Sequence, residues 1–165
     1  MLFKFKYVYL SIIAVLFWTQ GLSYSQLSFN DALTKAKSEN KKVIVDVYTD
    51  WCGWCKKMDA EAYSNDEVKK IIEDNFVFVK LNAEGKNKIT YNGKQYTEEE
   101  LSYYFEVFSF PTTIFLESDG KLIEYRYDNM KMKNLPGYFK TEEFKKILNY
   151  FKESKYNESD LSLVI

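Results

Sequence analysis

The 165-residue chain contains no histidine, and it has only two cysteines, two prolines and six glycines. The absence of histidine removes most general-base mechanisms, catalytic triads and transition-metal sites. The formal net charge is −1, so the composition does not favour binding to nucleic acid or to an anionic membrane surface. Aromatic residues, by contrast, are plentiful: 14 Tyr and 13 Phe provide enough bulk to fill the core of a single domain.

Both cysteines lie in one short segment, Cys52-Gly53-Trp54-Cys55. The β-branched run at residues 43–47 predicts a buried strand before it, and the polar residues after it predict a helix that begins at Gly53. A cysteine at a helix N-terminus faces free N–H groups and the positive end of the helix dipole, which lower the pKa of the Cys52 thiol. The thiolate is the nucleophile of thiol–disulfide exchange, and Cys55 can resolve the mixed disulfide. The pair therefore predicts dithiol–disulfide chemistry that needs no cofactor.

Two other interpretations of the pair are a zinc site and a structural disulfide. Zinc needs about four ligands, and with two Cys and no His the others would be carboxylates or would come from a second chain. A structural bridge that closes so short a loop would constrain the unfolded chain little. We therefore expect a redox role and no metal.

The N-terminal residues have the pattern of an export signal. Lys4 and Lys6 form a positive region, residues 7–18 are largely apolar, and residues 22–25 place small side chains before a cleavage point ahead of Gln26. The apolar run is shorter than the about 20 residues of a membrane-spanning helix, although an uncleaved N-terminal anchor is the alternative. Residues 1–25 are therefore predicted to be a signal peptide. The mature protein would be periplasmic or secreted, where disulfides persist.

After the signal, hydrophobic periodicity and capping residues predict a series of helices and strands in a single domain over residues 26–154. Residues 155–165 show no clear period and are expected to form a loose tail. The order of elements predicts an α/β sandwich around a mixed sheet. The expected elements are a helix from Ser28, strands at 43–48 and 76–81, a helix after Cys55, a helix from a capping box at 64–67, an Asn-Gly hairpin at 89–96, a helix from Thr97, strands at 112–116 and 121–127 joined by a tight turn at 118–120, and a helix from Thr141.

The strand–Trp51-Cys-Gly-Trp-Cys55–helix unit and the later Phe110-Pro111-Thr112 resemble the thioredoxin superfamily from about residue 28 to about 152. The inserted hairpin at 88–97 and the segment 135–139 look like the extracytoplasmic SoxW-type thioredoxins. Residues 49–52 also resemble the C-terminal domain of DsbD-type membrane reductant carriers. The resemblance implies a thioredoxin-like three-layer sandwich, a mixed central β-sheet flanked by helices, with an inserted β-hairpin.

The resemblance also implies roles for single residues. Pro111 matches the family's cis-proline, which lies against the disulfide and helps seat an extended substrate that pairs with the backbone of Phe110. A trans proline that opens an edge strand is the alternative. Asp46 matches a buried acid whose raised pKa would suit it to exchange a proton with Cys55. An exposed Asp46 paired with a lysine is the other interpretation.

Four more residues complete the predicted site. Lys80 matches a lysine beside the buried acid, and a direct pair with it would oppose the rise of the acid's pKa. Trp51, Gly53 and Trp54 are expected to contact substrate, although Trp51 could equally be a core residue. Trp54 stands where thioredoxin has proline, so the reduction potential and the direction of electron flow stay open.

The predicted function is an exported, monomeric thiol–disulfide oxidoreductase that acts on disulfide-bearing proteins, as a reductant. A membrane electron carrier is its candidate partner, and no nucleic acid is expected. The catalytic set is Cys52, Cys55, Asp46 and Pro111. The alternatives are a disulfide oxidase or isomerase with the same residues, and a non-catalytic binding or chaperone module. The hairpin at 88–97 is either a docking feature or an elaborated loop.

Overall fold

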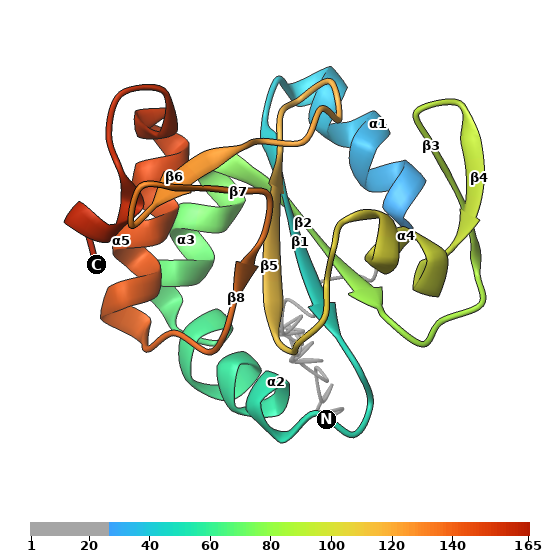
Figure 1. Ribbon diagram of the computed structural model, residues 1–165, viewed down its shortest axis with the longest axis horizontal. Coiled ribbons are helices and arrows are strands. Elements are labelled where there is room, and N and C mark those ends of the chain that lie inside the picture. The colour runs from blue at the N-terminus through green and yellow to red at the C-terminus, as the bar shows by residue number, and fades with distance from the viewer. Residues whose placement is uncertain (1–26) are drawn as a thin grey trace, which may run out of the picture.

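A four-stranded mixed sheet lies at the centre of the computed structural model, which describes residues 27–165 (Figure 1). Its strands run in the order β2 (Phe76–Asn82), β1 (Lys42–Tyr48), β5 (Thr112–Leu116) and β8 (Leu135–Pro136). Strand β1 is parallel to β2 and antiparallel to β5, and β5 is antiparallel to β8. The predicted signal peptide at residues 1–25 lies outside the described residues.

Alternate side chains of β1 point to opposite faces of the sheet and belong to two different hydrophobic cores, one on each face. Val43, Val45 and Val47 pack with α1, α4 and the hairpin β3–β4, whereas Ile44 packs with α2, α3 and α5 (Figure 1). Asp46 lies on the same face as Ile44, because both are even-numbered positions of one strand. The predicted three-layer α/β sandwich with an inserted hairpin is confirmed. The remaining elements are α1 (Phe29–Glu39), α2 (Gly53–Met58), a π-helical turn (Asp59–Tyr63), α3 (Asp66–Asn75), β3 (Lys88–Tyr91), β4 (Lys94–Thr97), α4 (Glu98–Tyr104), β6 (Tyr125–Tyr127), β7 (Met130–Met132) and α5 (Thr141–Lys152).

Local capping and turn chemistry sets most of the element boundaries. The Ser28 side chain caps α1, and Asn92 and Gly93 both have positive φ, as the predicted type I′ hairpin requires. The predicted capping box at Ser64 is wrong: Asn65 is the N-cap of α3, and its Oδ1 accepts from two backbone N–H groups. The Ser64 hydroxyl is unavailable because it donates to the carbonyl oxygen of Ala60.

The capping box of α4 joins the inserted hairpin to the helix that follows. Glu100 N–H donates to Thr97 Oγ1 over 3.0 Å, and Thr97 N–H donates to the Glu100 carboxylate over 2.7 Å. Thr97→Ala should lower the free energy of unfolding by about 1 kcal/mol, because one N–H of the first turn loses its acceptor. Urea titration checks this, with Thr97→Ser as the matched control that keeps the hydroxyl. Equal stability of the two variants would contradict it.

The predicted strand at 121–127 is confirmed only in part: the tight turn at 118–120 forms, but only the last three residues form a strand, and they pair elsewhere. Leu122 makes a single bridge to β5, after which the chain leaves the sheet and β6 pairs with β7. The Tyr125 ring packs edge-on against Phe151, and its hydroxyl donates to the Asn134 carbonyl. Strand β8 takes the place beside the start of β5.

Residues 155–165 fold back onto the domain instead of forming the expected loose tail. They contain two short 3-10 turns, and Leu161 is fully buried. The Asp160 carboxylate accepts from the N–H groups of Asp128 and Asn129, both of which have positive φ in the β6–β7 turn. The contacts of Asp160 join residues 31 and 32 positions apart and have no helical or strand period, so hydrophobic periodicity does not reveal them.

Candidate active site

The two cysteines lie where β1 ends and α2 begins, as the sequence predicts. They form a disulfide with a Cα–Cα distance of 5.3 Å, and both residues are 4% exposed. Cys52 is the N-cap of α2, and its Sγ accepts a hydrogen bond from the Cys55 N–H over 3.0 Å. In the reduced protein, a free N–H and the helix dipole at this position favour the Cys52 thiolate over the thiol.

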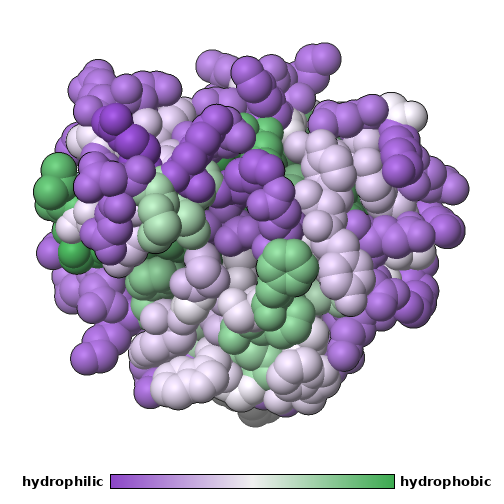
Figure 2. All heavy atoms as spheres, viewed as in Figure 1, coloured by the Kyte–Doolittle hydropathy of each residue, from purple (hydrophilic) through white to green (hydrophobic). Residues whose placement is uncertain are grey.

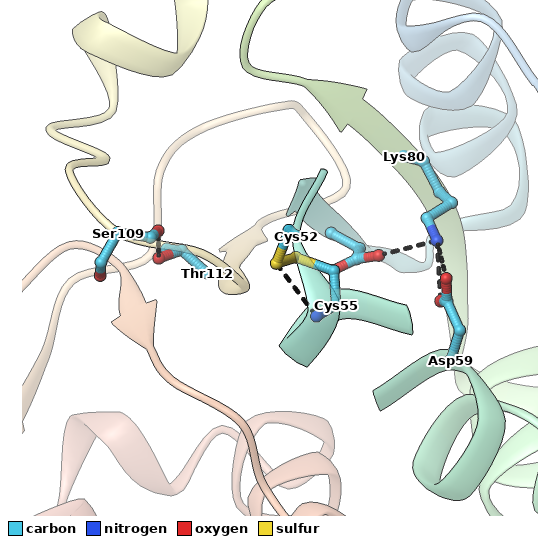
Figure 3. Close-up of a disulfide and its surroundings, with 7 residues drawn as sticks. Cys52, Cys55, Asp59, Lys80, Ser109 and Thr112 are labelled. Atoms are coloured by element: carbon cyan, nitrogen blue, oxygen red, sulfur yellow. Dashed lines mark hydrogen bonds and ion pairs between the residues drawn. A yellow bond between two sulfur atoms is a disulfide. The ribbon is translucent and has the colours of Figure 1, made fainter. Parts of the chain in front are cut away.

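The loop that contains Pro111 faces the disulfide because β5 runs antiparallel to β1. Thr112, the first residue of β5, lies opposite Val47 near the end of β1, so the preceding loop reaches the same edge of the sheet. Figure 3 shows Ser109 and Thr112 of this loop on one side of the cysteine pair. The Thr112 hydroxyl donates to the Ser109 carbonyl over 2.7 Å. The Phe110–Pro111 peptide bond is cis, as the resemblance implies.

Exposed aromatic side chains surround the pair. Trp51 is 67% exposed, and its ring meets Phe110 edge-on at 5.9 Å. Its indole N–H donates to Glu84 over 3.0 Å. Trp51 is therefore a surface residue held by a hydrogen bond, and the alternative interpretation of Trp51 as a core residue is wrong. Trp54 is 58% exposed, and a side chain at Gly53 would meet open space. Figure 2 shows apolar side chains gathered over the α4–β5 connection, next to the end of the sheet that carries the cysteines.

Asp46 lies beneath this surface and is 2% exposed. Burial raises the pKa of Asp46 to about 6, and the neighbouring Lys80 opposes that rise only in part. The Lys80 Nζ lies 3.2 Å from Asp46 Oδ2, whereas Asp46 Oδ1 has no hydrogen-bond partner among residues 27–165. The interpretation of Asp46 as an exposed residue is therefore wrong. The sequence left open whether burial or the Lys80 ion pair controls the pKa of Asp46, and burial has the larger effect.

Asp59 is a site residue that the sequence analysis missed. Both of its carboxylate oxygens lie 2.7 Å from Lys80 Nζ, so one lysine bridges a buried and a half-exposed carboxylate (Figure 3). Burial alone would lower the pKa of Lys80, but the two carboxylates raise it. The only sequence signal was spacing: Asp59 lies about one helical turn after Cys55, while its partner comes from β2.

Other kinds of site are not evident near the cysteines. Among the described residues, no three Cys, Asp or Glu side chains are placed to hold a metal ion. None of the helices between residues 27 and 165 is long and apolar enough to cross a bilayer. A pocket opens beside Lys80, between the start of α1, β2 and the β2–β3 connection, but neither cysteine lines it.

Comparison with known proteins agrees with this geometry. A family model described as a thioredoxin-like domain matches residues 29–152. The thiol:disulfide interchange protein DsbD of Actinobacillus pleuropneumoniae is 26% identical over 149 residues, which cover 82% of this chain and 23% of that protein. The chain spans less than a quarter of the length of the curated relatives that it matches.

Two solved structures extend the comparison to the fold. A Bacteroides thetaiotaomicron protein proposed to be a disulphide-isomerase is 28% identical, with 81% of this chain and 93% of that one covered and a TM-score of 0.58. A thioredoxin-fold protein from Helicobacter pylori is 20% identical, with 76% and 80% covered and a TM-score of 0.58. Since the family model matches residues 29–152, which include both cysteines and Pro111, this chain belongs to the thioredoxin-like domain family.

Proposed function

We propose that the protein is an exported oxidoreductase that reduces disulfides in other proteins. The observation that carries the proposal is the Cys52–Cys55 pair at a helix N-terminus, with Cys52 Sγ accepting an N–H and aromatic side chains around it. A surface of this kind suits a polypeptide substrate better than a small disulfide.

Exchange proceeds in two displacements on the reduced protein. The Cys52 thiolate attacks one sulfur of the substrate disulfide, a Cys52–substrate disulfide forms, and the other substrate sulfur leaves as a thiolate. The Cys55 thiolate then attacks Cys52 Sγ, which closes the Cys52–Cys55 disulfide and releases the second substrate thiolate. The substrate gains two electrons and the protein loses two, so an external dithiol must reduce the protein again.

Asp46 supports the second displacement by removing the proton of Cys55. Its pKa of about 6 keeps it mostly ionised at neutral pH yet basic enough to hold a proton briefly. Lys80 pairs with both Asp46 and the half-exposed Asp59, so this group of charges extends from the core to the half-exposed side of the site.

The substrate is held by the surface around the cysteines. The backbone of Phe110 pairs with an extended segment of substrate beside Pro111, while Trp51, Gly53 and Trp54 contact its side chains. The open space at Gly53 allows that segment to approach the disulfide closely.

Export rests on the N-terminal sequence, with its positive region, short apolar run and cleavage point before Gln26. The likeness to DsbD supports a periplasmic location and a membrane electron carrier as the external dithiol. An N-terminally anchored form would keep the same domain at the same side of the membrane.

The direction of electron flow is testable by the reduction potential of the pair. We expect the Cys52–Cys55 couple to titrate below about −200 mV, nearer to thioredoxin than to the strong oxidant DsbA. Equilibration with glutathione or dithiothreitol buffers, followed by thiol alkylation and mass spectrometry, measures it. Cys55→Ser, which has no second thiol to pair, is the control. A potential near −120 mV would favour the oxidase or isomerase, which the Bacteroides thetaiotaomicron relative makes the second candidate.

A further inference from the structure

Trp54, between the two cysteines, is paired with an aromatic residue that comes from the far end of the chain. The rings of Trp54 and Tyr138 lie 5.4 Å apart at an interplanar angle of 42°. Lys57 Nζ lies 5.1 Å from the centroid of each ring, so one ammonium group contacts both. Together with the contact between Trp51 and Phe110, the pair of Trp54 and Tyr138 is the second aromatic contact made by a tryptophan of the motif.

Tyr138 reaches this place because the end of β8 is tied to the active-site loop. The N–H of Gly137 donates to the Pro111 carbonyl over 2.9 Å, and Gly137 has a φ of 111°, a conformation that strongly favours glycine. The Tyr138 hydroxyl donates to the Glu61 carboxylate, while the Glu61 carbonyl accepts from Thr141 over 2.9 Å. The ring position is therefore fixed by backbone and side-chain bonds on both sides.

The pair forms an apolar surface without net charge. Trp54 is 58% exposed, Tyr138 is half-buried, and Lys57 lies 4.0 Å from Glu61, so the two nearby charges balance. Exposed, immobilised Trp and Tyr rings lose little conformational freedom on binding, which is why such residues dominate binding energy at interfaces. Packing within the domain does not explain the exposed ring of Trp54.

We propose that Trp54 and Tyr138 form a preset aromatic platform that binds an apolar side chain next to the reactive cysteine of a polypeptide substrate. Lys57 and Glu61 are positioning residues: Lys57 contacts both rings, and Glu61 accepts from the Tyr138 hydroxyl. The inference rests on the proposed function and specifies its substrate: extended polypeptides with a large apolar residue beside the cysteine.

Two synthetic peptide disulfides test the platform on the reduced full-length protein. Each is a symmetric dimer of a hexapeptide with a central cysteine, with Phe beside the cysteine in one and Ser in the other. We expect the second-order rate constant to be about fivefold higher for the Phe peptide, as one added aromatic contact allows. Acid quenching and chromatography of the released thiol measure both constants.

Tyr138→Ala should bring the ratio of the two constants close to one, whereas Tyr138→Phe should keep most of the preference through the ring. Leu163→Ala, a substitution of an 81% exposed side chain in the C-terminal segment, is the control and should leave the ratio unchanged. A wild-type ratio near one, or an unchanged ratio in Tyr138→Ala, would overturn the platform. If wild type reduced neither peptide nor hydroxyethyl disulfide, the proposed function would fail, and the inference with it.

Discussion

Replacing Cys55 with serine is expected to turn the protein into a trap that stays covalently joined to its substrate through Cys52. The first displacement needs only the Cys52 thiolate, which keeps the helix N-terminus and the N–H of residue 55. The second displacement needs a sulfur at residue 55, and a serine hydroxyl cannot replace it at neutral pH. Turnover of a protein disulfide such as insulin should fall by roughly a thousandfold or more, as it does when a nucleophile is removed.

The trapped species separates the roles of the two cysteines. Non-reducing electrophoresis and mass spectrometry should show a substrate adduct on Cys52 in Cys55→Ser, which dithiothreitol releases. Cys52→Ser should lose turnover to a similar extent and form little adduct, because only residue 52 is the N-cap of α2, where a sulfur accepts a helix N–H that stabilises the thiolate. Adduct formation mainly in Cys52→Ser would reverse the assignment. Full insulin reduction by Cys52→Ala would indicate a binding module that needs no thiol.

The part of the site that is encoded locally was predictable from the sequence. The β-branched strand, the helix start after Cys52 and the capping box at Thr97 are decided by neighbours within a few residues. Alternation along β1 places Asp46 on the face below α2, which follows from the period of a strand. The cis bond before Pro111 came from resemblance, because composition and periodicity do not indicate it.

The contacts that the sequence did not reveal join segments far apart in the chain. Lys80 meets Asp59 across 21 positions, and Tyr138, which follows β8, meets Trp54 of α2 because β8 pairs with β5. The first pair depends on how the π-helical turn after α2 packs on β2, and the second depends on where β5 and β8 end. Element ends are the least predictable feature of a sequence. The burial of Asp46 was therefore predictable, whereas the contact of Asp59 with Lys80 was not.

Replacing Asp46 with asparagine is expected to make the protein more stable at pH 8 and no more stable at pH 3. The folded-state pKa of Asp46 is raised from 3.8 to about 6, chiefly by burial. Between these values the folded protein holds a proton that the unfolded chain has lost, so the wild-type free energy of unfolding falls as pH rises through this window. The fall totals about 3 kcal/mol and is complete above the folded-state pKa.

Urea titrations of the oxidised proteins from pH 3 to pH 8 measure this as a difference curve between Asp46→Asn and wild type. The difference should be near zero below pH 3.8, rise between pH 4 and 6, and level off at up to about 3 kcal/mol. Asp66→Asn, which makes the same substitution at a fully exposed carboxylate, is the matched control. A flat curve for Asp46→Asn would contradict a raised pKa.

Because asparagine cannot accept the Cys55 proton, the same variant should resolve mixed disulfides more slowly at neutral pH. On the proposed mechanism, the carboxylate that costs stability above its folded-state pKa is therefore the base that the second displacement needs.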